Sequence, residues 1–177
     1  MKASLPALSK DDKEREFLRH LAFRNGFRLE EGRSYLVKEP KPLHGVEAFT
    51  ILLSRGFQGL YITRQHPQHV RRRAEIRDCR VIWLSSTLGK DYVDPHNLSS
   101  LINLLRVFIE TSDRSVVFID GLEYLVTNND FSRVLHFLEC VNEVVMESLG
   151  ILILSVDDRA FQKRELALLE KNTLPLP

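Results

Sequence analysis

The segment that most constrains the fold is a run of four apolar residues, 116–119, that leads directly into Asp120. A continuous apolar run of this length predicts a strand that is buried on both faces, as in a parallel sheet covered by helices. Ligands of open α/β sheets bind at the carboxyl ends of such strands. The segment therefore predicts an α/β fold with an acid at the edge of the sheet where ligands bind.

Further apolar segments alternate with amphipathic ones along the chain. Strands are predicted over residues 34–37, 59–63, 80–84, 115–120 and 150–155, and helices over 43–54, a short basic stretch from Pro67, 98–109, about 130–148 and 159–171. Strands and helices that alternate in this way form parallel sheets through right-handed crossovers. We therefore predict a three-layer α/β/α sandwich around a mostly parallel five-stranded sheet.

The length of 177 residues and the 44% hydrophobic content predict one globular domain with an N-terminal extension. We divide the chain into a leader with an amphipathic helix, residues 1–30, and an α/β domain, residues 31–177. The apolar stripe of the first helix is formed by Phe17, Leu18, Leu21 and Ala22. Because the sheet does not need this helix, the stripe is a candidate surface for self-association.

The two cysteines are too few for a disulfide framework, and the first residues lack the apolar core of a secretory signal. No apolar run approaches the ~20 residues that cross a bilayer as a helix. We therefore expect a cytoplasmic protein with reduced thiols and no direct membrane insertion.

The segment after the first predicted strand lacks the residues that bind nucleotide phosphates. Phosphate loops of the pattern G-x-x-x-x-G-K-[ST] supply backbone N–H groups, a lysine and a magnesium-binding hydroxyl. The segment here is K-E-P-K-P-L-H-G, residues 38–45, in which two prolines lack an N–H and Glu39 would repel phosphate. Residues 63–66, T-R-Q-H, also offer no carboxylate to activate water. We expect an extended loop without an anion-binding nest, no cofactor and no catalytic residue.

Several blocks of the sequence carry a resemblance to a known family. They are G-L-Y-I-T-R-Q-H-P at residues 59–67, W-L-S at 83–85, P-x-N-L at 95–98, and D-G-L-E-Y-L at 120–125 followed by Asn128 and Asn129. Their order and spacing resemble the archaeal domain-of-unknown-function family 835 over roughly residues 33–171. That family in turn resembles the RecA and KaiC ATPases, although it has no phosphate loop. The resemblance implies a RecA-like fold and an archaeal, cytoplasmic setting.

Asp120 and Glu123 form a candidate degenerate Walker B-like pair. An acid after a buried strand often only accepts hydrogen bonds from the backbone of the next turn, and without a phosphate loop we favour this structural role for Asp120. For Glu123 a structural role and an ion pair with an arginine across the sheet edge both stay open. Without a catalytic group, the chain is not expected to be an enzyme.

A basic segment covers residues 64–80. Its six arginines are Arg64, Arg71, Arg72, Arg73, Arg77 and Arg80, against Glu75 and Asp78. Such a run could bind nucleic acid or an acidic protein face. We favour a solvated helix instead, because the net charge of the chain is only +1 and no aromatic residue interleaves the run. The first five of these arginines are still the best interaction candidates, whereas His66, His69 and Cys79 are too few to form a metal site.

These patterns predict a non-catalytic protein-interaction or scaffolding module that has lost ATP hydrolysis. The expected partner is another protein or a second copy of the chain. Two alternatives stay open: a nucleotide-binding regulator with residual affinity through Asp120, and an accessory protein that binds nucleic acid through the basic segment.

Overall fold

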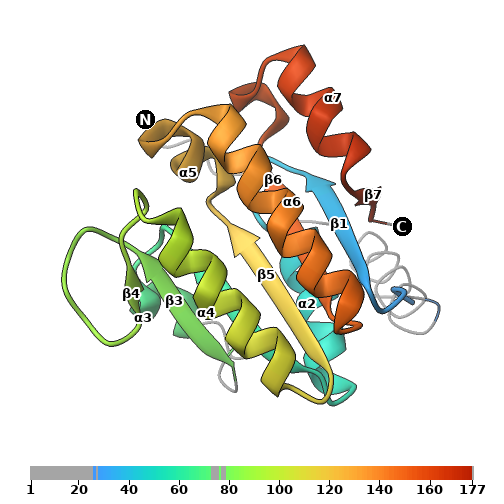
Figure 1. Cartoon of the computed structure of the whole chain (residues 1–177). Coiled ribbons are helices and arrows are strands. Elements are labelled where there is room, and N and C mark those ends of the chain that lie inside the picture. The colour runs from blue at the N-terminus through green and yellow to red at the C-terminus, as the bar shows by residue number, and fades with distance from the viewer. Residues whose placement is uncertain (1–25, 27, 73–75, 77–78, 177) are drawn as a thin grey trace, which may run out of the picture.

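A parallel seven-stranded sheet forms the centre of the fold in the computed structural model, which describes residues 26, 28–72, 76 and 79–176 (Figure 1). The strands are β1 (Arg33–Lys38), β2 (Gln58–Thr63), β3 (Arg80–Leu84), β4 (Tyr92–Val93), β5 (Ser115–Asp120), β6 (Ile151–Val156) and β7 (Leu174–Pro175). Their order across the sheet is β4-β3-β2-β5-β6-β1-β7. The sheet order changes direction beside β5, which places the end of that strand where an open α/β sheet forms its crevice.

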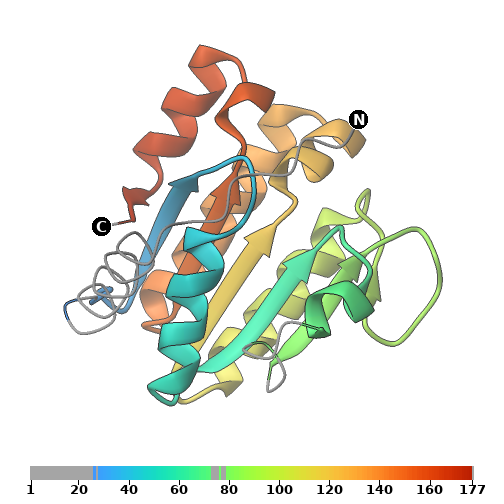
Figure 2. The same ribbon diagram turned by 180° about the vertical axis from the view of Figure 1, so that it is seen from behind.

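Helices cover both faces of the sheet. The face seen in Figure 1 carries α4 (Leu98–Thr111), α5 (Leu122–Asn128) and α6 (Phe131–Glu147), and Figure 2 shows α2 (His44–Ser54) and α3 (Pro67–Arg71) on the opposite face. A 3₁₀ turn (Asp158–Ala160) and α7 (Lys163–Lys171) follow β6. The predicted three-layer α/β/α sandwich is therefore confirmed. None of the described helices is long and apolar enough to cross a membrane.

The strands bury alternate side chains on the two faces. Leu60 and Ile62 of β2 belong to the core beneath α4 and α6, whereas Tyr61 between them belongs to the core beneath α2. On the α2 side the rings of Phe49, Tyr61 and Phe118 pack with centroid distances of 4.7–5.8 Å. Both faces of the central strands are apolar because both are covered, as the run at residues 116–119 predicts.

Three details differ from the prediction. The sheet has seven strands rather than five, because the two-residue strands β4 and β7 extend its edges. The sequence did not predict α5, and α7 begins at Lys163 rather than residue 159, after the 3₁₀ turn. The first predicted helix, with Phe17, Leu18, Leu21 and Ala22, lies outside the described residues, so the division between residues 1–30 and 31–177 stays a prediction.

Candidate functional site

A polar cleft of about 250 Å³ lies at the carboxyl ends of the central strands. The loop after β1 contributes Glu39 and Lys41, and the end of β2 contributes Arg64. The acids in its lining come from other elements, namely Asp120 at the end of β5, Glu123 in α5 and Asp157 after β6. The cleft therefore lies where ligands of parallel α/β sheets bind.

Glu39 lies at the N-terminus of α2 and is only 7% exposed. One of its carboxylate oxygens accepts the N–H groups of Leu43, at 3.0 Å, and His44, at 2.8 Å. The other accepts the N–H of Gly45 at 3.0 Å and the hydroxyl of Ser155 at 2.7 Å. Backbone N–H groups that converge at a helix N-terminus favour an anion, and here the chain supplies that anion itself.

The expectation of a loop without an anion-binding nest is therefore wrong. Pro40 and Pro42 do lack N–H groups, but the donors of the nest follow the second proline, in residues 43–45. We still expect Glu39 to oppose phosphate binding, because its carboxylate already accepts the hydrogen bonds of these N–H groups. The sequence signal was a glutamate shortly before the start of a helix. Whether its carboxylate contacts the first N–H groups of that helix, four to six residues later, depends on how the loop folds.

Gly45 allows α2 to start against the sheet. A Cβ at this position would lie 2.7 Å from Cε2 of Phe118 and 2.9 Å from Oε1 of Glu39. Because real Cβ atoms do not approach other atoms this closely, either the Phe118 ring or the Glu39 carboxylate would have to move. The glycine thus permits both the helix packing and the position of the carboxylate.

Asp120 ends β5 in a half-buried position. Its Oδ2 lies 3.4 Å from Oγ1 of Thr63 and 3.4 Å from Nε2 of Gln65, both at the end of the neighbouring strand β2. The predicted structural role gave Asp120 backbone donors and nearby side chains as partners, and these two donors are side chains. Gly121, which follows, has φ of +140° and packs against the backbone of Arg64, so β5 can turn into α5 without a side-chain clash.

Glu123 joins α5 to the end of β6. Its Oε1 accepts the backbone N–H of Asp157, so the contact is with the backbone and not with an arginine. The Asp157 carboxylate in turn accepts two hydrogen bonds from the guanidinium of Arg159, at 2.8 and 2.7 Å. These hydrogen bonds hold the pKa of Asp157 below its ordinary value. The Walker B-like acids therefore contact protein groups at the edge of the sheet.

We expect Asp120→Asn to change the free energy of unfolding by less than about 1 kcal/mol, because the side-chain oxygen of asparagine can still accept from neutral donors. Urea unfolding of the two proteins measures this difference. A loss of several kcal/mol would show that the negative charge of Asp120 itself stabilises the fold.

Arg64, Arg71 and Arg72 of the basic segment are exposed, whereas Arg73 and Arg77 lie outside the described residues. The structure brings aromatic rings to this segment from other strands. The ring centroid of Trp83 in β3 lies 4.9 Å from that of His66 and 5.0 Å from that of Tyr92 in β4. No aromatic residue interleaves the basic run along the sequence, but the fold places Trp83 beside His66 and Tyr92 beside Trp83.

Among the described residues, no group of three or more His, Cys, Asp or Glu side chains could hold a metal ion. His66 and His69 do lie close together, with ring centroids 6.4 Å apart. The Nδ1 of His66 accepts the N–H of Gln68 at 3.3 Å and caps α3. This histidine therefore has a local structural role.

Three comparisons place the chain among known proteins. The sequence profile of the family described as Protein of unknown function (DUF835) matches residues 38–172. A KaiC-like protein from the hyperthermophilic archaeon Pyrococcus horikoshii OT3 is similar in structure, with a TM-score of 0.56, 14% identity, and coverage of 78% of this chain and 70% of that chain. The flagellar accessory protein FlaH from Methanocaldococcus jannaschii has a TM-score of 0.57, 13% identity, and coverage of 94% and 76%. The comparison with curated proteins finds no match.

Proposed function

This chain belongs to the family described as Protein of unknown function (DUF835), and from that premise we propose that it is a non-catalytic member of the RecA-like fold class. In this proposal it neither binds nor hydrolyses ATP and serves as a protein-interaction or scaffolding module. The archaeal and cytoplasmic setting that the family resemblance implies stays part of the proposal.

The carboxylate of Glu39 in the nest at the N-terminus of α2 is the observation that carries the proposal. A nucleotide phosphate at this position would need the N–H groups that Glu39 accepts, at 2.8–3.0 Å. Moving Glu39 aside would leave a buried carboxylate without its hydrogen bonds, which is costly. If it stayed, the two anions would repel each other. The residues at this position therefore do not fit a bound nucleotide.

The remaining charges of the cleft also oppose a polyphosphate. Asp120 and Glu123 lie in the lining on the side of β5 and α5, whereas Lys41 and Arg64 are its exposed cations. These two cations do not outnumber the carboxylates around them. The cleft thus lacks the excess of positive charge that phosphate-binding sites use.

A thermal-shift experiment tests the loss of nucleotide binding. A ligand at ~100 times its dissociation constant stabilises a protein by about 2.7 kcal/mol, which for a domain of this size raises Tm by about 5–10 °C. We expect no change in Tm with millimolar magnesium-ATP and no phosphate release, whereas a RecA-like ATPase with a glycine-rich phosphate loop responds in both assays. A shift of several degrees with ATP would contradict the proposal.

The scaffolding role is supported by exposed apolar side chains on the α4 and α6 face. Val107 and Met146 are each 60% exposed and Leu149 is 59% exposed. Exposed apolar side chains provide apolar area for an interaction surface. They provide, together with the stripe of the predicted first helix, two candidate surfaces for a second copy of the chain or another protein.

Self-association can be assigned to one of these surfaces by light scattering across a concentration series. We expect the full chain to form oligomers and the Phe17→Asp, Leu21→Asp variant to be monomeric, because the charges would interrupt the apolar stripe. The matched control is Val107→Asp, Met146→Asp on α4 and α6. If only this control became monomeric, the interface would be the α4 and α6 face, and a wild-type chain that is monomeric at high concentration would contradict self-association.

A further inference from the structure

Four rings line the corner between α3 and the β3–β4 edge of the sheet. They belong to His69, His66, Trp83 and Tyr92, and successive ring centroids lie 6.4, 4.9 and 5.0 Å apart. We refer to these four side chains as the ring cluster. Both histidines are exposed, and Trp83 and Tyr92 are partly exposed, so solvent reaches the cluster along its length.

Contacts with the backbone hold the ring cluster in place. The indole N–H of Trp83 donates to the carbonyl oxygen of Arg64 at 2.9 Å. The backbone at Gly89 lies against the ring of Tyr92, since a Cβ there would lie 2.5 Å from Cδ2 of that ring. The rings are therefore positioned before any partner binds, which lowers the entropy lost on binding.

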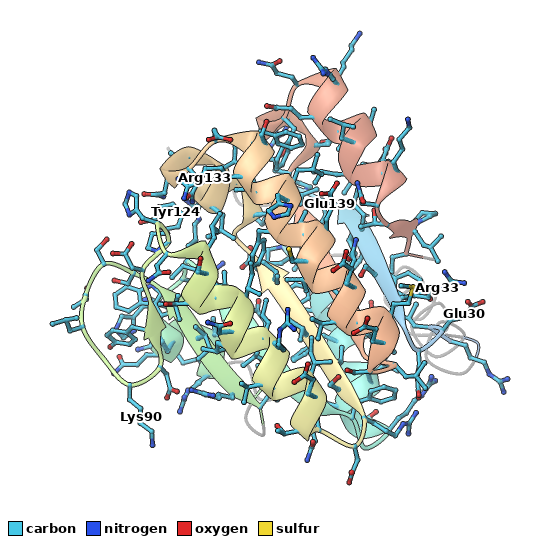
Figure 3. All side chains as sticks on the ribbon, in the orientation of Figure 1. Glu30, Arg33, Lys90, Tyr124, Arg133 and Glu139 are labelled. Carbon is cyan, nitrogen blue, oxygen red and sulfur yellow. The ribbon has the colours of Figure 1, made fainter. Side chains whose placement is uncertain are left out.

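Exposed cations lie on the two chain segments next to the ring cluster. Arg64, Arg71 and Arg72 are exposed on the α3 side, and Lys90 extends away from the loop between β3 and β4 (Figure 3). Within the described part of the chain, none of these four cations has an acidic ion-pair partner. The neighbouring acid, Asp91, is already paired with Arg80 at 3.1 Å. The surface therefore carries net positive charge that is available to a polyanion.

We propose that this surface binds single-stranded nucleic acid. The four cations contact phosphates, and the exposed rings of the cluster stack on unpaired bases, the combination of contacts by which single strands are bound without sequence preference. An acidic protein segment would use the cations but would give the rings no base to contact. In a duplex the bases are stacked on one another and their faces are not available. Arg64 borders both this surface and the cleft, but none of the four rings lines the cleft, and binding at the rings does not depend on the proposed function.

Trp83 gives a direct measurement because it is the single tryptophan of the chain. The full-length protein is titrated with oligothymidylate of about 20 nucleotides, longer than the ~4–16 nucleotides that a comparable site covers. We expect quenching of the tryptophan fluorescence as bases stack on the cluster. For four phosphate contacts the slope of log K against log salt is about −2.8, so affinity falls roughly 50-fold between ~50 and ~200 mM salt.

Two variants with the same change in net charge distinguish binding at this surface from a general effect of net charge. Arg71→Glu, Arg72→Glu removes two of the four contacts, so we expect the salt slope to fall by about half and the affinity to fall more than about tenfold. Arg106→Glu, Arg133→Glu is the control on the opposite face, where Arg133 lies at the start of α6 (Figure 3), and its affinity should change less than about twofold. Circular dichroism confirms that both variants are folded.

Three results would overturn the inference. Equal losses in the two variants would mean that binding follows net charge alone. Duplex DNA bound as tightly as the single strand would exclude a role for base stacking. Polyglutamate that binds with the same affinity and salt slope as the oligonucleotide would show that the surface binds acidic protein segments.

Discussion

Replacing Glu39 by glutamine is expected to lower the free energy of unfolding by about 2–4 kcal/mol, because hydrogen bonds to a charged acceptor are stronger than neutral ones and the amide nitrogen cannot accept any. In the wild type the two carboxylate oxygens accept three backbone N–H groups and the hydroxyl of Ser155. The glutamine NH₂ would face at least one of these donors. The variant would also lose the negative charge at the N-terminus of α2.

Urea unfolding of the wild type and Glu39→Gln measures this loss. The matched control is Glu170→Gln, which removes an exposed carboxylate that pairs with Lys38 at 2.8 Å. Exposed pairs contribute less than about 1 kcal/mol, so the control should unfold close to the wild type. If Glu39→Gln were no less stable than Glu170→Gln, the nest would not depend on its internal anion.

Gly45→Ala is expected to destabilise the fold by about 2–3 kcal/mol, since overpacking of a close contact costs about 1–3 kcal/mol or more. The new methyl group would start 2.7 Å from the ring of Phe118 and 2.9 Å from the carboxylate of Glu39. Either the helix start or the carboxylate must shift. A shift of the carboxylate would remove the anion from the nest at the N-terminus of α2 and so destabilise this helix.

The control for this substitution is Gly26→Ala, because a Cβ at Gly26 would meet no atom within 4 Å. Combining Gly45→Ala with Glu39→Gln identifies which group moves. If the methyl group displaces the Glu39 carboxylate, the two losses should be less than additive by about 1 kcal/mol or more. A Gly45→Ala protein as stable as the wild type would contradict the packing at the start of α2.

The sequence predicted the central part of the sheet well because its strands are continuous apolar runs. β2, β3 and β5 bury both faces, and such runs differ clearly from the amphipathic helices between them. The edge strands β4 and β7 have two residues each, too short for any periodic pattern. Helix α5 was missed because its seven residues, directly after Gly121, contain fewer than two full turns of an apolar pattern.

The site was predicted less completely because its contacts join distant parts of the chain. The sequence indicated correctly that Asp120 lies at the carboxyl edge of the sheet, but its donors Thr63 and Gln65 come from the end of β2 and the loop after it. Glu39 was recognised by its charge, yet its bond to Ser155 spans 116 positions of the chain. Trp83 reaches His66 through the pairing of β2 with β3, and Tyr92 reaches Trp83 through the pairing of β3 with β4.

Calorimetric titration of the full chain with magnesium-ATP tests the central claim most directly, namely that the internal carboxylate of Glu39 takes the place of a nucleotide phosphate. With this anion in the nest, the titration should give only the heat of dilution at protein concentrations that detect micromolar binding. Saturable binding of one ATP per chain with micromolar affinity would contradict the account, because it would require the Glu39 carboxylate to leave its four hydrogen-bond donors.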